Sequence, residues 1–145
     1  MDERKNRYVR LPNELFSMGL DHNEIAVYTY LLYCENHRKN LCYPSYGAIG
    51  RTLKMCKNTV RKYVASLVDK HLIETEETQV IVRGRKRNGN LKYTFLPLRE
   101  AMDRYTKRQM EAARLEAAKQ KAEKKLEAFD RTHPAYEEKQ YDHHR

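Results

Sequence analysis

The sequence predicts a mainly α-helical domain with a small β-hairpin, followed by a long C-terminal helix. Three observations predict this class. Two short helical segments with apolar backs are joined by a tight turn over residues 45–73, strand-like segments with a turn signal follow over 72–96, and residues 98–129 contain neither Gly nor Pro. The 145 residues suffice for one globular domain of ordinary size and an extension.

The charge of the chain is positive and unevenly distributed. The sequence holds 29 Lys and Arg against 20 Asp and Glu, a formal net charge of +9, and its pI is near 9.5. Residues 1–97 hold 17 basic and 10 acidic side chains (17 − 10 = +7), whereas residues 98–145 hold 12 and 10 (12 − 10 = +2). A polyanionic partner is therefore expected, and it is expected to bind the part that precedes the long helix.

The cysteines and the apolar segments limit the classes of protein to which this chain can belong. Cys34, Cys42 and Cys56 form no closely spaced ligand pair, and an odd number argues against a disulfide framework, so we expect reduced thiols. No apolar run approaches the roughly 20 residues of a membrane span. The first five residues are too polar to begin a secretory signal, and a cytoplasmic protein is expected.

The N-terminal part of the chain is expected to contain little regular structure before the first long helix. Residues 1–7 are charged and are expected to be mobile. Residues 8–11 alternate between polar and apolar side chains and are interpreted as a short strand, and residues 13–16 as a brief helix that closes near Gly19.

The first long helix is predicted from Glu24 to about Asn36. Asp21 has the position of an N-cap, and Glu24, three residues on, supplies the other half of a capping box. The helix carries a broad apolar face, which predicts that it lies at the centre of the core.

The next helix is predicted from Ser45 to Leu53. Ser45 carries a hydroxyl that can cap the first free backbone N–H groups, and Pro44 stops any earlier helix. Two helices that cross closely need a small residue at the contact, and Gly50 provides it. These features indicate the first half of a helix-turn-helix.

The second helix of this pair is predicted from about Lys57 to Lys70, with an apolar back and a basic front. The apolar back consists of Val60, Val64, Leu67 and Val68. The side chains expected to face outward near its start, where a recognition helix presents residues to the major groove, are Cys56, Lys57, Asn58, Arg61, Lys62 and Ala65.

A β-hairpin is predicted directly after this helix pair. Strands are expected over 72–76, 78–82 and 91–96, and the loop between the last two contains Asn88-Gly89, a strong hairpin-turn signal. Such a hairpin is a wing, so a winged helix-turn-helix domain is expected over 8–97. Four cations are expected at the tip of the wing: Arg83, Arg85, Lys86 and Arg87.

A long charged helix is predicted over 98–130. Its first turns are expected to pack on the winged domain through Leu98, Met102 and Tyr105. Farther on, the apolar stripe is thin and rich in alanine, which favours a solvated or partner-dependent helix over a strong coiled coil. Residues 131–145 are expected to be a disordered tail, and the pair His143-His144 is too short to indicate a metal site.

Five short segments follow one another in a recognisable order: Leu11 to Phe16, Ala26-Val27-Tyr28, Tyr43-Pro44-Ser45, Thr59-Val60-Arg61 and Leu72-Ile73. Together they resemble the winged helix-turn-helix domains of bacterial replication initiators and replisome organisers carried by plasmids, phages and conjugative elements. The resemblance covers residues 8–96, and its most specific parts are Tyr-Pro-Ser and Thr-Val. The resemblance implies a role in replication initiation or its control on a mobile genetic element.

Three residues depart from the pattern of that family. Lys54 stands in the turn and His71 before the final Leu-Ile, where glycine is usual, and both positions tend to need a left-handed backbone. Cys56 begins the second helix where serine is more usual, so its capping is expected to be weaker.

The leading hypothesis from the sequence is sequence-specific binding of double-stranded DNA. Asn and Arg side chains on the second helix can pair bidentately with adenine and guanine, and hydroxyl and wing residues can hold phosphates. The predicted DNA-binding residues are Ser45, Tyr46, Lys57, Asn58, Thr59, Arg61, Lys62, Arg83, Arg85, Lys86 and Arg87.

Two alternatives to a role in replication stay open. In the first, the chain is a transcriptional regulator with the same mode of DNA binding. In the second, it is a protein-interaction adaptor that uses the winged domain and the C-terminal helix. A homodimer or a replisome or regulatory partner would bind through helix 98–130. We expect that the protein is not an enzyme and that it binds no cofactor or metal. Its sequence holds no Gly-rich phosphate loop, no clustered metal ligands and no paired carboxylates near a nucleophile.

Overall fold

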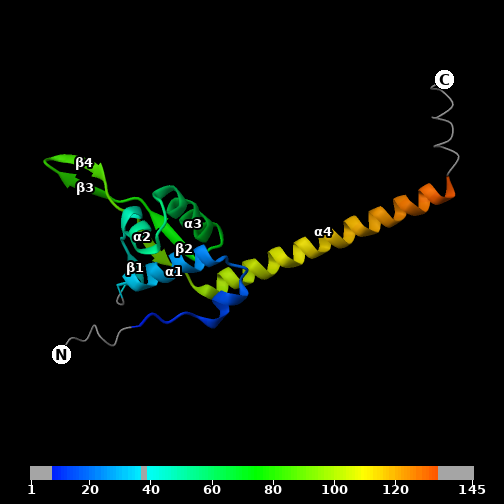
Figure 1. The fold of residues 1–145 in the computed structure, drawn as a ribbon, viewed down its shortest axis with the longest axis horizontal. Coiled ribbons are helices and arrows are strands. Elements are labelled where there is room, and N and C mark those ends of the chain that lie inside the picture. The colour runs from blue at the N-terminus through cyan, green and yellow to red at the C-terminus, as the bar shows by residue number, and fades with distance from the viewer. Residues whose placement is uncertain (1–7, 37–38, 134–145) are drawn as a thin grey trace, which may run out of the picture. The chain divides into compact units, whose positions relative to one another are not determined.

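The computed structural model describes residues 8–36 and 39–133. Residues 37–38 and the two ends, with the expected mobile segment and most of the expected tail, lie outside the described residues. The chain divides into two units, with the boundary between Tyr105 and Thr106. The elements in chain order (Figure 1) are η2 (Asn13–Ser17), α1 (His22–Cys34), β1 (Leu41–Cys42), α2 (Tyr46–Leu53), α3 (Lys57–Asp69), β2 (Ile73–Glu76), β3 (Gln79–Val82), β4 (Arg85–Asn88), β5 (Lys92–Phe95) and α4 (Leu98–Thr132).

The first unit packs three helices with a small antiparallel sheet. The sheet has the strand order β1-β5-β2, and Ile73 lies opposite Phe95 where β2 meets β5. Helix α1 contacts both α2 and α3, so the predicted central core helix is confirmed. The largest fully buried side chains come from the helices, from β2 and β5 and from the segments that flank them: Tyr93, Leu15, Leu31, Ile49, Leu67, Leu72, Ile73, Val27 and Val60.

The N-terminal prediction is correct for the helices and wrong for the strand. Residues 8–11 form no strand, and Tyr8 is exposed, because an alternating pattern of four residues has no partner strand here. Element η2 confirms the brief helix, and Gly19 follows it with a φ of 67°. Asp21 caps α1, and the reciprocal bonds of the capping box with Glu24 are both present.

The hairpin forms from different strands than the sequence predicted. Strand β3 pairs with β4, not with the strand over 91–96, and Val82 lies opposite Arg85. The turn is therefore Arg83-Gly84, whose φ angles of 52° and 72° are both positive, as a two-residue turn of type I′ requires. Asn88 lies within β4, so the Asn88-Gly89 signal does not mark the turn.

The long C-terminal helix is confirmed and runs from Leu98 to Thr132. Its first turns belong to the first unit, where Ala101 is buried and Leu98 and Met102 pack against the core. The ring of Tyr105 lies close to Gly19, within 3.1 Å of where a Cβ would stand. No helix in the described part of the chain is both long and apolar enough to cross a membrane.

Candidate nucleic-acid interface

Helix α2 begins and ends as its sequence predicts. The Ser45 hydroxyl oxygen accepts a hydrogen bond from the backbone N–H of Ala48 at 3.0 Å, which caps the helix. Helix α2 ends at Leu53, and the capping residue Lys54 that follows has the left-handed backbone angles φ 59° and ψ 45°. The backbone N–H of Met55 then donates to the carbonyl of Gly50 at 2.9 Å, so the chain turns back sharply toward α3.

Gly50 lies where the turn approaches α2 most closely. A Cβ at this position would overlap the carbonyl oxygen of Met55 and would touch Val60 at 3.6 Å. The Met55 oxygen is a backbone atom, so the overlap cannot be relieved by a side-chain rotation. The small residue that the sequence predicted at the helix crossing is therefore confirmed.

Helix α3 presents two contrasting faces. Val60, Val64 and Leu67 are buried against the core. Near the start of the helix the opposite face leaves these predicted side chains exposed: Cys56, Lys57, Asn58, Arg61, Lys62 and Ala65. The helix geometry therefore places three cations and one amide side by side on the solvent face.

Two of the cations lie over aromatic rings. The guanidinium carbon of Arg61 is 5.8 Å from the centroid of the Tyr46 ring, and Lys62 Nζ is 5.4 Å from the Tyr63 ring. Contacts of this kind favour a restricted set of rotamers without consuming the N–H donors of the cation. Tyr46 is only partly exposed, and its ring packs against the core as well as lying beneath Arg61.

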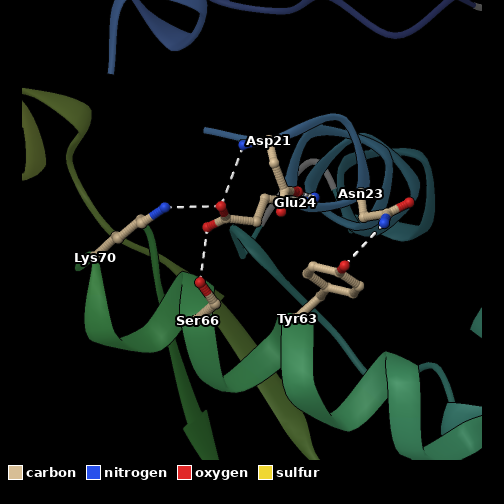
Figure 2. A network of polar contacts seen from close by, with 6 residues as sticks. All are labelled: Asp21, Asn23, Glu24, Tyr63, Ser66 and Lys70. Carbon is tan, nitrogen blue, oxygen red and sulfur yellow. Dashed lines mark hydrogen bonds and ion pairs between the residues drawn. The ribbon is translucent and has the colours of Figure 1, made fainter. Parts of the chain in front are cut away.

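A buried carboxylate joins the start of α1 to α3 (Figure 2). Glu24 is 3% exposed and accepts hydrogen bonds from Lys70 Nζ at 2.7 Å, Ser66 Oγ at 2.8 Å and the backbone N–H of Asp21 at 3.2 Å. A second bond lies beside it, from the side-chain amide of Asn23 to the hydroxyl of Tyr63 at 2.9 Å.

These bonds give Glu24 two roles. The first, as part of the capping box of α1, was predicted from the sequence. The other role, as an acceptor for Ser66 and Lys70, ties the C-terminal end of α3 to the start of α1. These bonds add to the packing of the apolar face of α3 and stabilise the rotation of α3 about its axis.

The exit of α3 carries the second left-handed residue. His71 has a φ of 59°, the backbone N–H of Leu72 donates to Leu67 O at 3.1 Å, and the N–H of His71 donates to Val68 O at 3.0 Å. This pair of bonds is a Schellman motif. The expectation that Lys54 and His71 need left-handed backbone is confirmed at both positions.

The start of α3 is capped weakly, as expected. Cys56 makes no side-chain capping bond to the backbone, and its Sγ lies 3.0 Å from the hydroxyl oxygen of Thr59. The hydrogen bond with the Thr59 side chain lowers the pKa of the exposed Cys56 thiol. Burial has the opposite effect on Cys42 and raises the pKa of that thiol to about 12.

The four wing cations do not all lie at one tip. Arg83 occupies the turn, whereas Arg85, Lys86 and Arg87 lie along β4. Because side chains alternate along a strand, Arg85 and Arg87 share one face of the hairpin, and Lys86 lies on the other. All four are exposed.

The apolar residues on the arginine face of the wing were not predicted from the sequence. Val80 lies opposite Arg87 and Val82 opposite Arg85, so the arginine face of the hairpin is half apolar. Val80 and Val82 are 45% and 43% exposed. The type I′ dipeptide Arg83-Gly84, with β-branched residues before it, was the sequence signal for this arrangement.

Polar contacts fix the base of the wing. The hydroxyl of Thr78 donates to the carbonyl oxygen of Asn90, and the side-chain amide of Asn90 donates to the carbonyl of Tyr43 at 3.2 Å. The N–H of Gly89 donates to Thr78 O at 2.8 Å, and a Cβ on Gly89 would stand 2.6 Å from Thr78 Oγ1. Gly89 thus permits a close approach of the two chain segments.

Comparison with known proteins supports the helix-turn-helix. Residues 19–73 match the family described as "Helix-turn-helix domain". The matched segment spans α1, β1, α2 and α3 and ends at the first residue of β2, before the β3–β4 hairpin.

The other comparisons add little. A solved structure described as a possible transcriptional regulator from Methanosarcina mazei Go1 is similar at 14% identity and a TM-score of 0.47, over 72% of this chain and 82% of that chain. No curated protein matches the sequence. Within the described residues, no group of three or more His, Cys, Asp or Glu side chains is placed to hold a metal ion.

Proposed function

We propose that this protein binds double-stranded DNA sequence-specifically, with α3 in the major groove and the β3–β4 hairpin on the adjacent backbone or in the minor groove. One observation carries the proposal. The exposed start of α3 presents Lys57, Asn58, Arg61 and Lys62 on one face, while its other face is buried in a helix-turn-helix. An α-helix fits the major groove of B-DNA, and amide and guanidinium groups recognise base edges there.

The residues of α3 have distinct proposed roles. Arg61 is held over the Tyr46 ring with its donors available, which suits bidentate contact with guanine. Asn58 can pair with adenine in the same way. Lys57 and Lys62, as point charges on flexible stems, suit either base acceptors or flanking phosphates.

Phosphate contacts are proposed around this helix. The Ser45 hydroxyl accepts the capping bond and keeps its own proton free to donate to a phosphate oxygen. Tyr46 and Thr59, which also carry hydroxyls, are the first residue of α2 and the third residue of α3. On the wing, Arg83, Arg85, Lys86 and Arg87 are proposed to bind backbone phosphates, and an arginine in a narrow minor groove is the other mode available to them.

The biological role that we propose is replication initiation or its control on a mobile genetic element, on the strength of the resemblance described above. Regulation of transcription uses the same interface. The location of the bound site separates the two roles, because a site within a replication origin indicates replication and a site within a promoter indicates transcription.

The test is a selection of bound sites from random double-stranded oligonucleotides, followed by anisotropy titrations of the selected duplex. We expect an enriched motif and an affinity that falls steeply with salt. Replacing both Arg61 and Lys62 by Ala should weaken binding to the selected site by at least about 10-fold, because a good base contact contributes about 1–3 kcal/mol of discrimination.

A matched control removes two charges from outside the interface, through Lys119→Ala with Lys124→Ala on α4. This variant should keep the affinity within about 2-fold. Absence of an enriched motif, together with no measurable affinity at low salt, would reject DNA binding and favour the protein-interaction alternative.

A further inference from the structure

The second unit presents an apolar stripe to solvent. From Thr106 to Thr132 every residue of α4 is exposed. Among them Leu115 is 73% exposed, Leu126 63% and Phe129 57%. Leu115, Ala118, Ala122, Leu126 and Phe129 follow each other at spacings of three or four residues, so they lie on one side of the helix. In proteins most of the stability of a helix comes from packing such a side, which indicates that something covers it.

Charge is arranged about this stripe in lines. Leu115, Ala122 and Phe129 are seven residues apart, close to two helical turns, and so lie nearly in line along the helix. The residues one position before Leu115 and Ala122, which are Arg114 and Lys121, form a basic flank, and Lys107 extends it by one period toward the N-terminus. The residues one position later, Glu116, Glu123 and Asp130, form an acidic flank on the other side of the stripe.

We propose that a second copy of this chain covers the stripe, with the two α4 segments parallel and in register. In a parallel pair the basic flank of each helix faces the acidic flank of the other, along both edges of the contact. In an antiparallel pair, flanks of the same charge meet. Arg114 and Lys121 of one helix then face the same basic residues of the other, and Glu116 and Glu123 face the same acidic residues. Charge complementarity therefore selects both the occupant and its direction.

The stripe is short, and this limits the strength of the dimer. Only three large side chains per copy are available for burial, and Lys119 stands at the edge of the stripe on its acidic side. Association must also offset the lost freedom of two molecules. We therefore expect a dissociation constant of roughly micromolar order, weakened by salt.

Sedimentation equilibrium of the full chain, from about 1 to 200 µM, tests the pairing. The expected mass rises with concentration from 17.4 kDa toward twice that value. The variant Leu115→Asp with Leu126→Asp should lower the association constant at least about 100-fold. Met110→Gln is the control, because Met110 is 59% exposed on the same helix, lies five residues from Leu115 on a different side, and this change adds no charge beside the basic flank.

Charge reversal tests the direction. Glu116→Lys with Glu123→Lys, and separately Arg114→Glu with Lys121→Glu, should each weaken association about 10-fold or more, and all four changes in one chain should restore it. An antiparallel pair would show no such loss and recovery. A chain that stays monomeric to about 200 µM, or charge variants that associate as the original does, would overturn the proposal. Neither readout uses DNA, so this result is independent of the proposed function.

Discussion

The Glu24–Lys70 pair allows a quantitative test of how α3 is held in place. The Glu24 side chain is 4% exposed, the Lys70 side chain is 29% exposed, and Nζ lies 2.7 Å from Oε1. The change Lys70→Met keeps most of the aliphatic stem and removes the ammonium group. The carboxylate then keeps its bonds to Ser66 and Asp21 but loses its charged partner.

The expected cost follows from this geometry. Removing one partner of a fully buried pair costs about 3–5 kcal/mol, and the partial exposure of Lys70 places this case at or below the lower end, about 2–3 kcal/mol. Glu24→Gln keeps a hydrogen-bond acceptor in place and leaves the Lys70 ammonium, which can reach water. We therefore expect the free energy of unfolding to fall by about 1–2 kcal/mol. The double variant should lose about 1 kcal/mol less than the sum, because the two groups interact directly.

The assay is urea unfolding followed by near-ultraviolet circular dichroism, because the buried tyrosines Tyr28 and Tyr93 report on the core and not on the exposed part of α4. Lys92→Met is the matched control. Its partner Glu76 is 71% exposed at 3.3 Å, and such a pair contributes about 0–1 kcal/mol. If Lys70→Met costs no more than Lys92→Met, or if the double variant is strictly additive, the reasoning about the network is refuted.

Three further predictions follow from the core and the thiols. Gly50→Ala should lower the free energy of unfolding by about 1–3 kcal/mol in the same urea assay, because the new methyl group overlaps the Met55 carbonyl; unchanged stability would contradict the close crossing. At pH 7.5 a thiol reagent such as iodoacetamide should label Cys56, which is exposed with a lowered pKa, well before the buried Cys42. Peptide mapping by mass spectrometry measures the two labelling rates, and equal rates would contradict this prediction. The pKa of Cys42 is raised from its ordinary value of 9 to about 12, and burial raises that of Tyr93 as well, so this contribution to stability is complete below about pH 9 and is lost as the pH rises toward 12. Thermal unfolding should show that loss between pH 9 and 12, with a shallower slope for Cys42→Ala; a flat profile would contradict the burial of these groups.

Short-range signals determined the helical part of this protein. The Ser45 cap, the Asp21–Glu24 capping box and the apolar spacing of α3 depend on residues within a few positions of one another, and each has the predicted geometry. The left-handed backbone at Lys54 and His71 was predicted from the resemblance to winged domains, in which glycine is usual at both positions, and not from a local signal.

Strand pairing was decided by the tertiary structure. The Asn88-Gly89 dipeptide is a stronger local turn signal than Arg83-Gly84, yet β5 pairs with β2 and β1 and is unavailable to β3. The segment 85–88, which by itself resembles a charged loop, then pairs with β3. The distribution of wing cations over two faces follows from that pairing and from no local pattern.

The candidate interface divides in the same way. The sequence by itself determined which residues of α3 face outward, because the helical period links them to a buried opposite face. Only the tertiary structure decided what holds that face in place: Lys70 reaches Glu24 across 46 positions of sequence, and Arg61 lies over Tyr46 on another helix. Contacts between residues far apart in the chain depend on how whole elements pack, and periodicity within one element carries no information about them.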